Sequence, residues 1–275
     1  MILVTGGSGV VGRAVVRALT HLGFKVIAPD RSSGYLNSLN DFLKVHPTTP
    51  ESIVHLAAEI PASKGYADTV ELSDENRRID QIVVGAARLW EIHVAYASGC
   101  SLYDNFTPRY HVEDEIIDGS QFGHYLQAKQ DGEDAFRGLG TASILRVAGF
   151  RGACTPPWAL AGRFVSAARE GRAITVNGDG LDEVDLVDLA DIAEAFVLAI
   201  RHRYVGSLNV ASGMPICVKD LASLVCQIAS AEKQPTFAGC QERRRYARFD
   251  ITRANTSLGW EPKIKLHESI LGMLL

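Results

Sequence analysis

Apolar residues along this chain follow two alternating spacings. Short aliphatic and β-branched runs, typical of buried strands, alternate with longer segments whose apolar positions recur every three or four residues, as on one helix face. The strand-like runs lie at 2–4, 24–29, 53–58, 93–97, 143–147 and 207–210. The helix-like segments lie at 11–22, 39–45, 79–90, 125–136 and 189–200. This alternation predicts an α/β fold, with a doubly wound, mainly parallel sheet covered by helices on both faces.

The pattern loosens after Gly149 into shorter elements, with no repeat and no low-complexity linker. We therefore expect a smaller lobe woven from later segments of the chain. The predicted division assigns 1–150 to the main body, with 186–211 returning to it. The smaller lobe is assigned 151–185 and 212–275.

Composition excludes several classes of protein. Hydrophobic residues make up 47% of the 275 positions, so the chain can bury a large core without disulfides. The formal charge is −4, from 28 basic and 32 acidic residues, which gives no footprint for nucleic acid or an anionic membrane. No apolar run approaches the roughly 18 residues that span a bilayer, and Met1 opens directly into a strand, so we expect a cytoplasmic protein. Five scattered cysteines without metal-ligand spacing predict reduced thiols and no metal site.

Three glycines, Gly6, Gly9 and Gly12, stand between the first strand and the first helix. Positions without side chains let the backbone and the helix N-terminus approach a pyrophosphate, although the same turn also serves helix-to-strand packing alone. Asp30 ends the second strand, where an acidic residue accepts hydrogen bonds from an adenosine ribose. Together these residues predict a dinucleotide site in a Rossmann-type sheet. Asp30 favours NAD, and the adjacent Arg31 leaves NADP as an alternative.

Tyr125 and Lys129 are four residues apart on a predicted helix, so the phenol and the ammonium lie on one face. A free phenol has a pKa of about 10, and a neighbouring cation makes the phenolate less costly. This pair therefore fits an acid/base that exchanges a proton with a substrate hydroxyl or carbonyl. The alternative is an exposed pair on a solvated helix face.

Small hydroxyl residues follow the strand at 93–97. Strand ends of such sheets border the ligand, so Ser98 or Ser101 is placed to donate a hydrogen bond to a reacting oxygen. A plain serine turn is the alternative, and we favour it for Ser101. His124, beside Tyr125, is a candidate substrate contact.

These motifs, in this order, resemble the extended short-chain dehydrogenase/reductase family, also described as NAD-dependent epimerase/dehydratases. Thr5 to Gly12 matches its TGxxGxxG turn, His55 to Ala58 resembles its HxAA segment, and Tyr125 with Lys129 matches its YxxxK. The resemblance extends over essentially the whole chain. Its later segments are Leu145-Arg146, Val176 to Asp191, and Leu258 to Pro262.

The resemblance implies an enzyme that exchanges hydride between a nicotinamide cofactor and a carbon bearing a hydroxyl or ketone. In most such members this carbon belongs to a nucleoside-diphosphate sugar, which is reduced as a 4-keto sugar or epimerised. Tyr125 would be the acid/base, Lys129 would hold the nicotinamide ribose, and Ser98 would polarise the substrate oxygen, with Ser101 in the loop wall. The implied cofactor contacts are Gly6, Gly9, Val10, Val11, Gly12, Asp30, Arg31, Leu56, Ala57, Ala58 and Lys129.

The sequence departs from the family at its substrate contacts. Val184 stands where many members that act on nucleotide sugars have Arg, and Gly149 and Arg151 replace a typical Asn and Tyr. Candidate replacements for binding an anion are Arg151, Arg163 and the cluster 243–245, with solvated surface as the alternative. These departures leave open a reductase of a non-nucleotide carbonyl compound, or a non-catalytic NAD(P)-binding regulator. A small-molecule substrate is expected as partner, and a homodimer stays open.

Overall fold

The computed structural model describes residues 1–30, 32, 39, 48–61, 67–118, 123–239 and 243–275. Within this part of the chain, one six-stranded parallel sheet has the order β10-β5-β4-β3-β1-β2. Its strands are β1 (Ile2–Thr5), β2 (Val26–Ile27), β3 (Ser52–His55), β4 (His93–Gly99), β5 (Ala142–Val147) and β10 (Gly206–Val210). The order reverses at β1, with β2 on one side and β3 on the other, which opens a crevice at the carboxyl ends of the strands. The predicted doubly wound α/β fold is confirmed.

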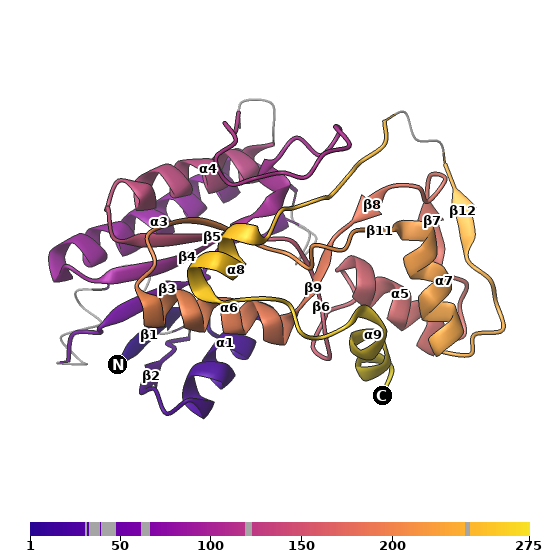
Figure 1. Ribbon diagram of the computed structural model, residues 1–275, viewed down its shortest axis with the longest axis horizontal. Coiled ribbons are helices and arrows are strands. Elements are labelled where there is room, and N and C mark those ends of the chain that lie inside the picture. The colour runs from indigo at the N-terminus through magenta and orange to yellow at the C-terminus, as the bar shows by residue number, and fades with distance from the viewer. Residues whose placement is uncertain (31, 33–38, 40–47, 62–66, 119–122, 240–242) are drawn as a thin grey trace.

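Helices cover both faces of the sheet (Figure 1). The helices α3 (Val70–Trp90) and α4 (His124–Arg137) pack on one face, and α1 (Val10–His21), α6 (Leu189–His202) and α8 (Thr252–Leu258) pack on the other. Each face holds its own apolar core, because strands buried on both sides need apolar cover on both. The helix expected at 39–45 lies outside the described residues, apart from Leu39.

A smaller lobe lies beyond the carboxyl ends of the strands (Figure 1). It contains α5 (Leu160–Arg169), α7 (Val218–Ile228) and α9 (Leu266–Leu274) around a core that includes Phe164, Leu221 and Ile270. Three short strand pairs complete it and join it to the sheet. They are β6 (Gly149–Arg151) with β9 (Leu186–Asp188), β7 (Thr175–Asn177) with β12 (Thr236–Ala238), and β8 (Glu183–Val184) with β11 (Ile216–Cys217).

The C-terminal segment does not stay within this lobe. The predicted division assigns 212–275 to the lobe, whereas Phe249, Leu258 and Trp260 pack in the core beneath the large sheet. The Trp260 indole is buried and donates to the backbone oxygen of Asp191 in α6 at 2.9 Å. The chain therefore returns to the main body before it ends in α9.

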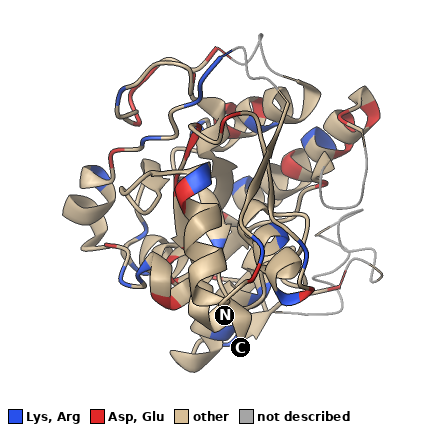
Figure 2. Ribbon diagram, turned by 90° about the vertical axis from the view of Figure 1, so that its right-hand side faces the viewer, with Lys and Arg blue, Asp and Glu red and all other residues tan. Residues whose placement is uncertain are grey.

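Charged residues of both signs lie on the surface of the smaller lobe. Figure 2 shows Lys and Arg interspersed with Asp and Glu on the side of the smaller lobe. No helix among the residues described is long and apolar enough to cross a membrane.

Candidate active site

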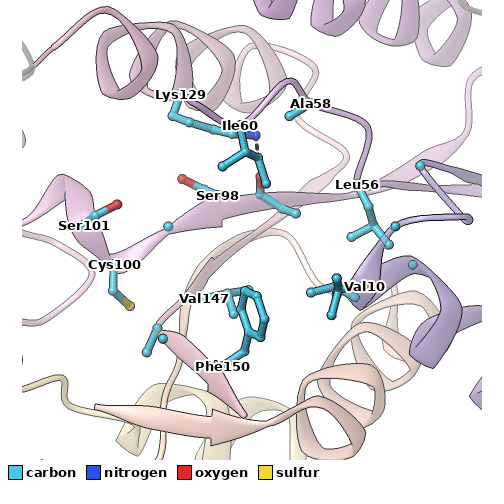
Figure 3. Close-up of a pocket in the computed structure, with 18 of the residues that line it drawn as sticks. Val10, Leu56, Ala58, Ile60, Ser98, Cys100, Ser101, Lys129, Val147 and Phe150 are labelled. Atoms are coloured by element: carbon cyan, nitrogen blue, oxygen red, sulfur yellow. Dashed lines mark hydrogen bonds between the residues drawn. The ribbon is translucent and has the colours of Figure 1, made fainter. Parts of the chain in front are cut away.

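A pocket of about 860 Å³ opens between the carboxyl ends of the strands and the smaller lobe (Figure 3). Both bodies contribute to its walls. Of the residues predicted from the sequence, it is lined by Gly6, Gly9, Val10, Val11, Gly12, Leu56, Ala57, Ala58, Ser98, Ser101, Tyr125 and Lys129. The structure thus gathers the glycine turn, the strand-end serines and the Tyr/Lys pair around one cavity.

The glycine turn leaves no room for side chains. A Cβ on Gly12 would lie 2.1 Å from the backbone oxygen of Gly6, and a Cβ on Gly6 would lie 2.7 Å from the backbone nitrogen of Ala57. Gly6 also has φ +69°, a conformation that favours glycine. Gly9 caps α1 without a side chain, so the unpartnered N–H groups of the first helical turn border the pocket. This cradle fits the pyrophosphate of a dinucleotide.

Asp30 stands at the edge of this cradle. Pro29 lines the pocket, and Asp30 follows it as an exposed residue. Its Oδ1 accepts from the backbone nitrogen of Ser32 at 2.9 Å, and this bond lowers the pKa of Asp30, which keeps the carboxylate charged. Arg31, the predicted alternative partner for a phosphate, lies outside the described residues.

Tyr125 and Lys129 extend from the first two turns of α4. Lys129 is buried, and its Nζ donates to the backbone oxygen of Ala97 at 3.0 Å, at the end of β4 (Figure 3). Burial lowers the pKa of Lys129, and the charges of Asp80 and Glu133 partly offset this effect by raising it. Burial also raises the pKa of Tyr125, to about 12, so its phenol is protonated at neutral pH. The pair lies in the pocket wall and not on a solvated helix face.

Ser98 has a different partner from the expected one. Its Oγ donates to Glu133 Oε1 at 2.5 Å, and Glu133 also accepts from Arg146 Nε at 2.9 Å and Nη2 at 2.6 Å. A serine has one O–H, and here it points into a buried ion pair. Ser98 lines the pocket while its hydroxyl is bound to Glu133, so the expectation that it donates to the substrate oxygen stays a prediction.

Ser101 occupies a more open position than its predicted place in a plain loop wall. It lies in the short helix η3 (Cys100–Leu102), is exposed, and lines the pocket. A Cβ on Gly99 would come within 3.2 Å of the Ser101 Oγ. The Ser101 hydroxyl thus lies next to the space that a side chain at the end of β4 would occupy.

Three predicted substrate contacts are absent from the described residues that line the pocket. Arg151 is buried, and its guanidinium donates to the backbone oxygens of Leu186 and Ile264. Arg163 and His124 are exposed elsewhere. The direction in which each side chain points from its strand or helix, which the sequence does not reveal, separates them from the pocket.

The smaller lobe and the C-terminal segment supply an apolar wall that the sequence did not indicate. Phe150 and Trp158 meet edge to face with ring centroids 5.8 Å apart. A Cβ on Gly149 would lie 2.7 Å from the Leu186 side chain, so the close approach of β9 excludes the Asn that is typical there. The other apolar residues of this wall are Leu160, Val184, Leu186, Ala247 and Phe249. Only its position directly after β5 could have suggested Phe150.

The arginine cluster lies outside the pocket lining and contacts it through a neighbouring loop. The guanidinium groups of Arg243 and Arg245 lie 4.0 and 5.7 Å from the ring centroid of Phe106, whose neighbour Asn105 lines the pocket. Arg244 pairs with Asp179 at the surface. Among the residues that the structure describes, no group of His, Cys, Asp or Glu could hold a metal ion.

Comparison with known proteins identifies the family to which this chain belongs. The model of the NAD dependent epimerase/dehydratase family matches residues 2–211. Among curated proteins, a UDP-glucose 4-epimerase of Mycolicibacterium smegmatis is 29% identical over 98% of this chain and 95% of its own length.

Solved structures share the fold over nearly the whole chain. A UDP-glucose 4-epimerase from Thermotoga maritima, solved with UDP-glucose, superposes with a TM-score of 0.87 at 22% identity, covering 99% of this chain and 97% of its own. RMD from Pseudomonas aeruginosa, solved with NADPH, gives 0.85 at 21% identity over the same shares. At these identities the likeness shows the fold alone.

Proposed function

Because the chain belongs to the NAD-dependent epimerase/dehydratase family, we propose that it exchanges hydride at a hydroxyl or keto carbon of a nucleoside-diphosphate sugar. The reaction is either reduction of a 4-keto sugar or epimerisation through one. The observation that carries the proposal is that the glycine cradle and the pair Tyr125 and Lys129 border one and the same pocket. A regulator without turnover would have no use for an acid/base pair in this position.

The cofactor would lie with its pyrophosphate at the N-terminus of α1 and its adenosine ribose beside Asp30. The charged carboxylate of Asp30 accepts from ribose hydroxyls and repels a 2′-phosphate, which favours NAD over NADP. When bound, the nicotinamide supplies the hydride acceptor or donor. RMD, which shares this fold, was solved with NADPH, so NADP stays the alternative cofactor.

The protein's own residues then handle the proton. Tyr125 gives its phenolic proton to a developing alkoxide in reduction, and in the reverse direction the phenolate so formed takes the hydroxyl proton back. Lys129 holds a buried ammonium at the end of β4, which stabilises the phenolate when it forms. The apolar wall around Phe150 and Trp158 excludes water from the reacting carbon.

Ser101 supplies the hydrogen bond to the substrate oxygen, because the Ser98 hydroxyl is bound to Glu133. We expect Ser101→Ala to lower the single-turnover rate of hydride transfer about a hundredfold, the range for losing one positioned donor. Ser98→Ala should lower it less. The double variant Gly99→Ser/Ser101→Ala should restore much of the rate, because residue 99 has extended backbone, with φ −137°, and its side chain points at the vacated space. A larger loss in Ser98→Ala would return the catalytic role to Ser98.

The substrate's diphosphate would be bound by Arg243 and Arg245, which contact the loop that borders the pocket, since the usual Arg is replaced by Val184. A second candidate, reduction of a non-nucleotide carbonyl compound, is favoured by the apolar wall. Among the described residues that line the pocket, the basic ones are Arg13 at the cofactor end and Lys129.

One experiment separates the two candidates. Purified protein with NAD(H), and in parallel NADP(H), is given UDP-, dTDP- and GDP-sugars, with chromatography of the products and calorimetry of UDP binding. We expect turnover of one nucleotide sugar with NAD(H), and UDP binding weakened at least tenfold in Arg243→Ala/Arg245→Ala. Absence of nucleotide binding, with reduction of simple ketones, would establish the second candidate.

Two finer points stay predictions. The cytoplasmic location stays an expectation drawn from the sequence. The homodimer stays an open prediction.

A further inference from the structure

Lys129 lies at one end of a buried chain of hydrogen bonds that runs from α4 through β4, α3 and β3 to β1. Its Nζ donates to the Tyr96 hydroxyl at 3.4 Å, and this hydroxyl donates to Asp80 Oδ2 at 3.0 Å. Asp80 Oδ1 lies 2.8 Å from His55 Nε2, and His55 Nδ1 lies 2.6 Å from Thr5 Oγ1. All five side chains belong to residues that are at most 8% exposed. The chain thus joins the acid/base site to the residue that precedes the glycine cradle.

On one side of Asp80 the chain consists of Thr5 and His55, and their hydrogen-bond donors point toward Asp80. Thr5 Oγ1 accepts from the backbone nitrogens of Leu56 and Ala57, at 3.3 and 3.4 Å, so its own O–H is directed to His55 Nδ1. This accounting assigns the imidazole proton to Nε2, which donates to Asp80. Asp80 therefore receives a hydrogen bond from β3.

On the other side of Asp80 the chain consists of Tyr96 and Lys129, and its donors also point toward Asp80. The Tyr96 O–H donates to Asp80, which leaves the Tyr96 oxygen free to accept from the Lys129 ammonium. The ammonium also lies 4.8 Å from the centroid of the Tyr96 ring, within range of a cation–π contact. Tyr96 thus links the carboxylate of α3 to the cation of α4.

A glycine inside α4 makes room for this link. A Cβ on Gly132 would lie 2.3 Å from the Tyr96 hydroxyl and 2.4 Å from Asp80 Oδ2. Glycine in a helix interior costs about 1 kcal/mol relative to alanine. Glycine stands at position 132 despite this cost, because any side chain there would displace the Tyr96–Asp80 hydrogen bond.

The charged and titratable groups around Lys129 come from three neighbouring elements and its own helix. Asp80 faces it from α3, and Tyr96 faces it from β4. His55 in β3 reaches it only indirectly, through its hydrogen bond with Asp80. Tyr125 and Glu133 belong to α4, the helix of Lys129 itself. Glu133 is already matched by the buried guanidinium of Arg146. Asp80 has no arginine partner among the described residues, so its charge acts on Lys129.

We propose that Asp80, acting through Tyr96, is a positioning residue that fixes the Lys129 ammonium beside Tyr125; this inference rests on the proposed function of that pair. Asp80 is not among the described residues that line the pocket. Its role is to supply the buried anion that makes a buried cation stable at the end of β4.

The expected pH effect has a definite sign. The Asp80 anion stabilises the Lys129 ammonium and opposes ionisation of the Tyr125 phenol, so it raises the pKa of both groups. Removing this charge lowers both. In Asp80→Asn, both limbs of the pH–rate profile should therefore move to lower pH, by about one unit.

The test measures Lys129 directly as well as turnover. Protein labelled with [ε-¹³C]lysine is titrated by NMR, and Lys129 is assigned by its missing signal in Lys129→Arg. We expect the Lys129 midpoint to fall by about one unit in Asp80→Asn, and less in Tyr96→Phe, which keeps the carboxylate. Gly132→Ala should lower it too, although neither partner is altered.

Two matched variants control for charge and for helix substitution. Asp131→Asn removes a half-exposed carboxylate from the same helix, paired with Arg77 at the surface, and should leave the Lys129 midpoint in place. Gly85→Ala places a Cβ where α3 has no neighbour within 4 Å, and should be equally silent.

The outcomes separate this inference from the proposed function. An unchanged Lys129 midpoint in folded Asp80→Asn overturns the inference whatever the substrate. Should Asp80→Asn not fold, unchanged midpoints in both Tyr96→Phe and Gly132→Ala overturn it instead. A lowered midpoint without turnover of any nucleotide sugar supports the inference and removes the proposed function.

Discussion

Replacing Tyr125 with Phe is expected to reduce turnover by about two orders of magnitude or more while leaving cofactor affinity nearly intact. The change removes only the hydroxyl that carries the proton, and Tyr125 lies in the pocket wall rather than in the glycine cradle. Steady-state rates on the true substrate, with calorimetry of NAD(H) binding, test both parts. Lys129→Ala should impair both, because its ammonium lies at the cofactor's predicted ribose as well as beside the phenol.

Tyr110→Phe is the matched control, since Tyr110 is 51% exposed and lies outside the pocket lining. It should retain normal rates. A Tyr125→Phe enzyme that turns over as fast as the unaltered protein would remove Tyr125 from the mechanism.

Gly12→Ala is expected to weaken NAD(H) binding by about tenfold to a hundredfold. The added Cβ would lie 2.1 Å from the backbone oxygen of Gly6, so the turn must open. Overpacking of this kind costs about 1–3 kcal/mol, which corresponds to that range of affinity. Gly9→Ala should be milder, because its Cβ would meet the same oxygen at 3.1 Å. Calorimetry of the two variants measures the series.

Gly272→Ala controls for helix substitution, because α9 has nothing within 4 Å of that position. Melting curves show whether each variant is folded. A folded Gly12→Ala protein that binds NAD(H) with unaltered affinity would mean that the turn serves packing alone, the alternative left open by the sequence.

The strands of the sheet interior could be predicted because their residues are buried on both faces. β3, β4 and β5 appear as apolar runs for this reason, and each begins or ends within two residues of its predicted bounds. The edge strand β2 is shorter than its apolar run, since it pairs on one side only. Helix α3 starts at Val70 rather than at 79, because Thr69 caps it and the buried Asn76 finds backbone partners in Glu59.

In the site, residues whose place is fixed by their spacing within one turn or helix could be predicted. The directions of side chains whose partners lie far along the chain could not. Gly12 and Lys129 border the pocket because their spacing within a turn or a helix fixes where they lie. Ser98 lies in the pocket wall too, yet its hydroxyl binds Glu133, which is 35 residues away in sequence. Arg151 points into the protein because backbone oxygens of distant segments accept from it. Such long-range partners leave no pattern along the chain.

The return of the C-terminal segment to the main body has a consequence during biosynthesis. β10 ends at Val210 and completes the sheet, but Trp260 and the helix α8 cover α6 only after about 50 further residues have been synthesised. At typical elongation rates of about 5–20 residues per second this interval lasts several seconds. The part of α6 that Trp260 and α8 cover stays exposed throughout that time, so the main body reaches its final packing only after this later segment has been synthesised.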